Sequence, residues 1–277
     1  MKKIVLFFFV GLLSTVSFAQ KKEKIKGTKI LKTERYDSDS FQEIEIEDNL
    51  EVYLIKGDKN SLEIETDDNL HVAIDHKTYG KTLRLNTNKD ISGFKKLEVR
   101  VTYTDSLKLI TVKHEAKLNA TSDLQVNNIT IKTFDYSKSL LNVNTPTFTL
   151  ITNDKSEIDL KAKSEDISIE MSKSSEIKAS LNCNKVKLDM YQKAEAVVDG
   201  NASEMKVRLD NNAKYNGKAI NSKLTYLTAE GSSNSSVLSN GPLSISVSGK
   251  AEVTIYGDPK IEIKKFADDA TLYKKSK

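Results

Sequence analysis

Apolar residues recur along this chain at a fixed spacing of 19 positions. Eight apolar residues follow one another at that step: Ile110, Ile129, Phe148, Ile167, Val186, Met205, Leu224 and Leu243. A second apolar set lies two positions after them: Val112, Ile131, Leu150, Ile169, Leu188, Val207, Tyr226 and Ile245. Alternation with a period of two indicates a β-strand with one buried face, and a fixed repeat length indicates a repeat architecture.

Each repeat contains further apolar positions, such as Ile158 and Ile177 in one set and Ala162 and Leu181 in another. The Lys, Ser, Asn, Asp and Gly residues between the sets accept turn conformations, so two or three short strands joined by tight corners are expected per repeat. Nineteen residues are too few for a packed helix pair, and the consensus of leucine-rich repeats is missing. The pattern predicts an all-β fold: a right-handed, single-stranded parallel β-helix, or β-solenoid, with about 19 residues per coil.

The remainder of the chain divides into three parts. Lys2 and Lys3 precede a short apolar run and a small-residue site at Ala19, so residues 1–19 are predicted to be a secretory signal peptide; a membrane anchor or an N-terminal core helix is the less favoured alternative. Residues 20–40 are expected to form a leader or a partly ordered cap. Residues 41–106 alternate with irregular spacing and are interpreted as irregular β-coils or a cap. They are expected to be continuous, as one domain, with the regular β-helix and C-terminal cap of residues 107–277.

Charge and cysteine content narrow the class of protein further. Without residues 1–19 the chain carries 41 basic and 39 acidic side chains with interspersed signs, which argues against a nucleic-acid partner. No transmembrane segment is expected downstream, so the product is predicted to be exported, either to the periplasm or to the cell surface and medium. Cys183 is the only cysteine, and its place in an apolar column predicts an inert buried thiol.

Several stretches resemble a known family. They are "FQEIEIEDNLEVYLIKGDKNSLEIETDDNL" from Phe41, "GKTLRL" from Gly80, and "LEVRVTYTDSLKLITVKHEAKL" from Leu97, followed by the stacked repeats. Together they resemble the domain of unknown function described as a putative auto-transporter adhesin, head GIN domain, common in Bacteroidota. The chain departs from that pattern at Tyr103-Thr104, where the family often has Val-Pro, and at residues 113–116, where a Gly-rich stretch is usual. The resemblance implies an exported parallel β-helix with an adhesin role, and it supplies no catalytic residues.

Candidate chemistry is sparse. His71, His76 and His114 are the only histidines, and none has metal-ligand spacing; His71 and His76, five apart, are expected on opposite faces of a strand. No catalytic residue, metal site or cofactor is therefore predicted.

The stacking does produce one candidate binding feature. Glu157, Glu176 and Glu195 share one coil position and are expected to project outward as a ladder about 5 Å apart. A Ca²⁺ ion would relieve their mutual repulsion, but nearby lysines offer the same relief without metal: Lys155, Lys178 and Lys193.

The sequence favours an exported, non-enzymatic binding or adhesion scaffold, with a surface glycan or an envelope protein as its partner. The alternative is a Ca²⁺-dependent carbohydrate-active enzyme of the polysaccharide lyase or hydrolase type that uses the glutamate ladder. A third hypothesis is a purely structural envelope protein. Ligand identity and oligomeric state are left open by the sequence.

Overall fold

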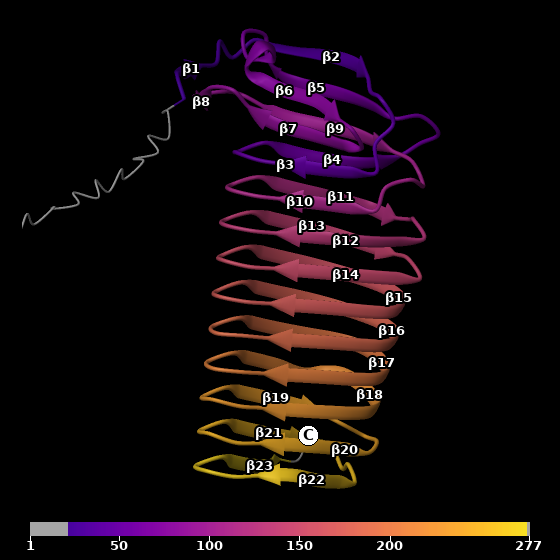
Figure 1. The fold of residues 1–277 in the computed structure, drawn as a ribbon, viewed down its shortest axis with the longest axis vertical. Helices are drawn as coiled ribbons and strands as arrows, with labels where there is room; N and C mark the ends of the chain where they lie inside the picture. Colours follow the sequence, from indigo (N-terminus) through magenta and orange to yellow (C-terminus); the bar gives the residue numbers. More distant parts are fainter. Residues whose placement is uncertain (1–21, 276–277) are drawn as a thin grey trace, which may run out of the picture.

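The computed structural model describes residues 22–275, so the predicted signal peptide lies outside the described residues. The chain forms stacked coils of about 19 residues that build a β-solenoid of about nine turns (Figure 1). This confirms the fold expected from the repeat. Among the described residues, no helix is long and apolar enough to cross a membrane.

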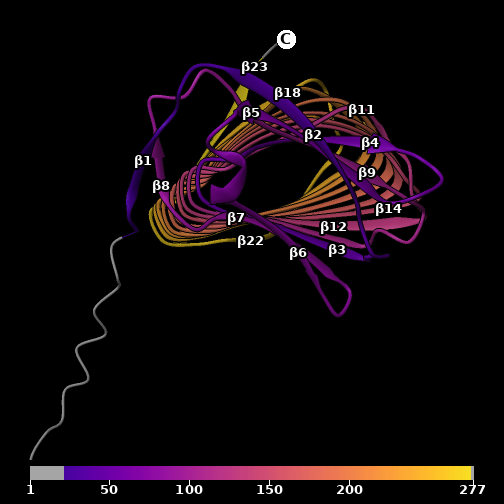
Figure 2. The same cartoon turned by 90° about the horizontal axis from the view of Figure 1, so that it is seen from above.

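Each coil has two faces of parallel strands, and successive coils overlie one another when viewed along the stack (Figure 2). The first face contains β3 (Glu43–Ile46), β10 (Leu109–Val112), β12 (Asn128–Thr133), β14 (Thr147–Thr152), β20 (Leu243–Val247) and β22 (Ile261–Phe266). The second contains β4 (Glu51–Lys56), β11 (Lys117–Leu124), β13 (Lys138–Asn144), β19 (Asn234–Leu238), β21 (Glu252–Tyr256) and β23 (Thr271–Lys275). Four long strands run from the second face into the first: β15 (Glu157–Met171), β16 (Glu176–Met190), β17 (Glu195–Leu209) and β18 (Lys214–Ala229).

The core consists of apolar columns that run along the stack. Ile167 pairs with Val186, and Val186 pairs with Met205, in successive coils. All three side chains are buried. The predicted piling of residues 19 apart is therefore confirmed in the central coils, and it keeps the inward positions apolar while outward positions vary.

The repeat is not free of insertions, contrary to the expectation of one uninterrupted register. Ile110 pairs with Ile131 rather than with Ile129, because two extra residues are accommodated in β11 between Ala120 and Leu124. Met205 pairs with Thr225 rather than with Leu224, because the register shifts by one residue where β17 meets β18. The single-residue shift turns Tyr226 outward, where it is 40% exposed.

One corner of every coil depends on a residue with a left-handed backbone. The positive φ residues at this corner are Asp48, His114, Asp135, Asp154, Lys173, Gln192, Asn211, Gly231, Gly249 and Asp268. Several backbone N–H groups there donate to a side chain of the next coil, as Lys173 does to Gln192 Oε1 at 2.8 Å. In the eight coils from His114 to Gly249, the residue two positions after the corner is a buried Ala or Ser, whose small size suits the tight bend: Ala116, Ser137, Ser156, Ser175, Ala194, Ala213, Ser233 and Ala251.

The N-terminal end of the solenoid is closed by antiparallel strands. β5 (Ser61–Asp67) pairs with β2 (Leu31–Asp37) on one side and with β9 (Leu97–Tyr103) on the other. β6 (Ile74–Tyr79) forms a hairpin with β7 (Thr82–Thr87), and the short helix η1 (His71–Ala73) precedes it. β1 (Lys24–Lys26) pairs with β8 (Asp90–Ser92). Residues 22–37 thus extend over this end of the molecule (Figure 1).

Asp67 joins three segments of this N-terminal end. Its buried carboxylate accepts hydrogen bonds from the backbone N–H groups of Lys29, at 2.7 Å, and Lys95, at 3.0 Å. Burial by itself raises the pKa of this carboxyl, but the backbone donors outweigh burial and the net pKa is lowered. The ionised form of Asp67 therefore stabilises the closed end.

Candidate ligand-binding groove

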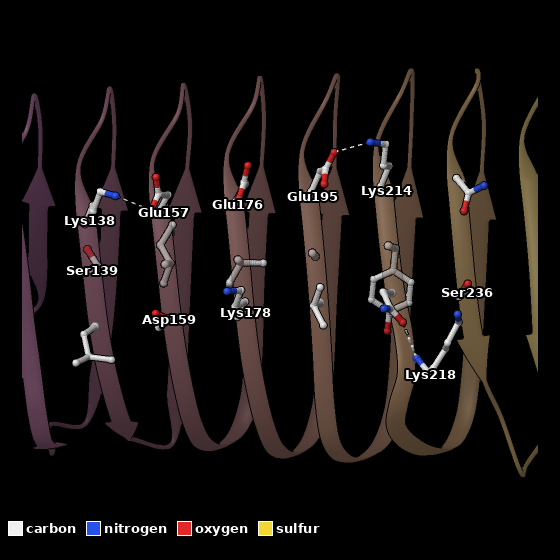
Figure 3. A pocket seen from close by; sticks show the side chains of 18 of the residues that line it. Lys138, Ser139, Glu157, Asp159, Glu176, Lys178, Glu195, Lys214, Lys218 and Ser236 are labelled. Atoms are coloured by element: carbon white, nitrogen blue, oxygen red, sulfur yellow. Dashed lines mark hydrogen bonds and ion pairs between the residues drawn. The ribbon is translucent and has the colours of Figure 1, made fainter. Parts of the chain in front are cut away.

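A shallow groove of about 660 Å³ runs along the second face, across several coils (Figure 3). It is lined by outward side chains of β11, β13 and β15–β19, from Lys117 at one end to Asn234 at the other, together with buried residues that lie between them in the strands, such as Ile158 and Ile177. Because each strand contributes alternate residues to its outer surface, the groove is bordered by columns that continue from coil to coil. Figure 3 shows these side chains projecting from successive strands.

The first column contains the glutamate ladder. Glu157 pairs in register with Glu176, and Glu176 with Glu195, and all three are exposed. The structure thus brings the predicted ladder together on one face. It ends in lysines of the same column, because Lys138 precedes Glu157 and Lys214 follows Glu195.

These two lysines, rather than the three expected from the sequence, form ion pairs with the two ends of the ladder. Lys138 Nζ lies 2.8 Å from Glu157 Oε2, and Lys214 Nζ lies 2.7 Å from Glu195 Oε1. The hydrogen bond to Glu195 and its negative charge raise the pKa of Lys214. Within residues 22–275, Glu176 forms no ion pair.

The lysines suggested by the sequence have other positions. Lys155 lies at the corner, with Nζ 5.0 Å from the centre of the Tyr136 ring. Neither Lys178 nor Lys193 forms an ion pair with any residue in the described part of the chain. Stacking explains the difference, since a column neighbour lies about 4.8 Å away and its side chain points in the same direction.

A second outward column borders the groove and was not singled out from the sequence. Its members, in coil order, are Asn119, Leu140, Asp159, Lys178, Val197, Asn216 and Ser236. Leu140 is 44% and Val197 49% exposed, so two apolar side chains face solvent between polar ones. The sequence does contain a signal for this column, because each member lies two residues after the member of the glutamate column in the same coil. Together the columns offer both charges, amide groups and apolar contacts to one bound molecule.

The histidines are separate from the groove. His71 lies in η1 rather than in the expected strand, and its Nε2 is 3.0 Å from the backbone oxygen of Lys32. The His76 ring stacks against Tyr36 with centroids 4.2 Å apart. His114 Nδ1 accepts the backbone N–H of Asp48. Across residues 22–275, no group of three or more His, Cys, Asp or Glu side chains is arranged to hold a metal ion.

Cys183 is buried, as predicted, and its thiol is free. Burial, followed by the nearby negative charge of Asp166, raises the pKa of Cys183 to about 11. The reactive thiolate is therefore scarce at neutral pH, which agrees with an inert thiol.

Comparison with known proteins gives a family and a fold. The family model described as "Putative auto-transporter adhesin, head GIN domain" matches residues 40–259. Similar solved structures include a "putative adhesin" from Parabacteroides merdae, with 15% identity, a TM-score of 0.63, and coverage of 91% of this chain and 99% of that one. From Parabacteroides distasonis come a "Putative lipid binding protein" (TM-score 0.64) and a "putative adhesin" (TM-score 0.65), each 15% identical and covering 91% of this chain and 100% of that chain. At this identity the likeness shows the fold alone. No curated protein matches the sequence.

Proposed function

The chain belongs to the family of putative auto-transporter adhesin head GIN domains, and from this premise we propose that it is an exported, non-enzymatic adhesion scaffold. Its ligand is a surface glycan or an envelope protein, bound along the groove of the second face. The observation that carries this proposal is the continuity of the groove over the strands from β11 to β19. A small molecule would contact only two or three coils, whereas an extended polymer can contact every coil at once.

The dimensions of the groove favour an extended ligand. The glutamate column runs through seven successive coils from Lys117 to Asn234. Six steps at the usual strand spacing give a length of about 29 Å. Exposed Leu140 and Val197 can pack against an apolar surface of the ligand, such as the face of a sugar ring or an apolar side chain.

A binding screen with matched variants tests the proposal. The purified protein is applied to a glycan array and used to capture envelope proteins, and any ligand is then measured with Val197→Asp and Tyr226→Asp. Val197 lies in the groove and Tyr226 on the first face, and both are substantially exposed, so the substitutions disturb folding to a similar extent. We expect at least tenfold weaker binding for Val197→Asp only. No ligand in either screen, or equal losses for both variants, contradicts the groove as the binding site.

Export is tested separately from binding. We expect the purified native protein to begin at Gln20, and added protease to reach it either on intact cells or after permeabilisation of the outer membrane. Recovery from the cytosolic fraction with residues 1–19 retained contradicts export while leaving the groove untouched.

The Ca²⁺-dependent lyase or hydrolase is not proposed. Its basis was the glutamate ladder together with an analogy of fold, and the ion pairs of Lys138 and Lys214 relieve the repulsion within the ladder at both ends. Turnover of acidic polysaccharides with Ca²⁺ that is lost in Glu176→Ala would reinstate this function.

A further inference from the structure

The two ends of the solenoid differ in how they are closed. At the N-terminal end, antiparallel strands and η1 cover the core, and Leu70 and Ala73 of the η1 segment are themselves buried. At the C-terminal end, β22 and β23 form the last described coil and each pairs with one neighbour only (Figure 1). Ile263 continues the inward column of Ile245, and yet it is 53% exposed. Within residues 22–275, this end therefore presents open core and strand edges without a partner.

The free edge of β22 has a specific hydrogen-bonding pattern. The backbone of Lys260 faces β20, because its oxygen accepts the N–H of Leu243 at 2.9 Å. The backbone of Ala267 also faces β20, because its N–H donates to Val247 at 3.1 Å. Their neighbours Ile261 and Phe266 thus present their backbone groups to the open edge. In a regular strand, residues five apart face opposite edges, and the register shift after Ile245 brings these two to the same edge.

The sequence of β22 is complementary to itself in the antiparallel direction. When two copies of "IEIKKF" pair about their common centre, Ile261 lies opposite Phe266 and Glu262 opposite Lys265. The first pair is apolar and has both backbones directed at the partner, as a hydrogen-bonded antiparallel pair requires. The second pair joins opposite charges on the outer surface. Each pair occurs twice in the dimer because of its two-fold symmetry.

We propose that two copies of this chain associate tail to tail, with β22 of each copy pairing antiparallel with β22 of the other. The arrangement covers the open core at Ile263 and Phe266 and uses the same surface on both copies. Because the opposite end is closed by the N-terminal strands, association stops at a two-fold dimer and does not continue as a fibre. Charge repulsion among lysines at this end opposes the association: Lys264, Lys265, Lys274 and Lys275. Lysines at exposed strand edges commonly disfavour pairing with another chain.

The test is the solution mass of the protein, measured by sedimentation equilibrium at low salt over a wide range of concentrations. We expect the mass to rise from one chain toward two and not beyond. Glu262→Lys places Lys opposite Lys in both charged pairs, and Lys265→Glu places Glu opposite Glu. Each variant alone should dimerise at least tenfold more weakly than the original protein.

Mixing the two variants provides the decisive control. In the mixed dimer, both charged pairs are again of opposite sign, so an equimolar mixture should recover the original dimerisation. Both residues are exposed, and far-UV circular dichroism will verify that each variant is folded. A monomer at every concentration, growth beyond a dimer, or a mixture no stronger than the single variants overturns the proposal.

Discussion

Replacement of Gly200 by alanine is expected to disrupt the centre of the solenoid. Gly200 lies in β17 with φ at +110°, in register with Leu181 of the preceding coil. A Cβ atom at this position would lie 2.0 Å from the backbone oxygen of Leu181. Ordinary contacts of this kind are 3.4 Å or longer, so β16 and β17 would have to separate by more than an ångström.

The loss of stability in Gly200→Ala has two sources, the strained backbone of the alanine and the hydrogen bonds broken between neighbouring coils. A positive φ costs an alanine about 1–2 kcal/mol. Separation of the coils removes two or three ladder hydrogen bonds, each worth about 1 kcal/mol. We therefore expect Gly200→Ala to lower the free energy of unfolding by about 3–5 kcal/mol. Since each coil contacts only its neighbours, the coils before and after Gly200 should also unfold less cooperatively with one another.

Gly80→Ala provides the matched control. Gly80 also has a positive φ, at +62°, but a Cβ there meets nothing within 4 Å. This substitution carries only the backbone cost, about 1–2 kcal/mol. Urea unfolding followed by far-UV circular dichroism compares the two variants. A Gly200→Ala protein that unfolds within 1 kcal/mol of Gly80→Ala refutes the reasoning about close coil contact.

Three further predictions concern buried groups. A Cβ on Gly217 would lie 2.2 Å from Oη of buried Tyr215, so Gly217→Ala should lower the free energy of unfolding by about 1–3 kcal/mol, and Tyr215→Leu should recover part of that loss in the double variant. Because the pKa of Asp67 is lowered in the folded protein, its carboxylate stabilises the fold fully above the unfolded pKa of about 4, and this stabilisation is lost as the pH falls through the folded pKa. Asp67→Asn should lower the free energy of unfolding at pH 7 by about 2 kcal/mol. The midpoint of urea unfolding, measured at several pH values, should then lose the part of its acid dependence that Asp67 causes. Cys183 should react with a disulfide reagent at least tenfold more slowly in the native protein than in urea, and equal rates would contradict its burial.

The core of the fold could be predicted from the sequence because inward positions obey one constraint in every coil. Residues 167, 186 and 205 are apolar for that reason. The two-residue insertion before Ile131 escaped detection, since a shift of two leaves the alternation of inward and outward residues unchanged. The one-residue shift near Thr225 was concealed because Leu224 and Tyr226 happen to be apolar while lying at less buried positions.

The closed N-terminal end could not be predicted in the same way. The pairing of β2 with β5 and of β5 with β9 joins segments far apart in the chain, and antiparallel strands have the same period of two as parallel ones. The left-handed corners had a partial signal in Asp135 and Asp154, 19 residues apart and of a type that tolerates positive φ. Lys173 and Gln192 interrupt that signal; at Lys173 the next coil supplies a compensating hydrogen bond from the Gln192 side chain.

The candidate groove could be predicted only in part, because the ion-pair partners of its glutamates lie in neighbouring coils and not nearby in the chain. Lys138 lies 19 positions before Glu157, and Lys214 lies 19 positions after Glu195. The repeat length that predicts the ladder therefore also predicts these two neighbours. In each strand, the residues that face the groove also alternate with the residues that form the core. Asp159, Lys178 and Val197 differ in charge and polarity, while the next residues in the three strands, Leu160, Ala179 and Val198, are all buried and apolar. An outward substitution can therefore change the charge and polarity of the proposed groove without altering the core beneath it.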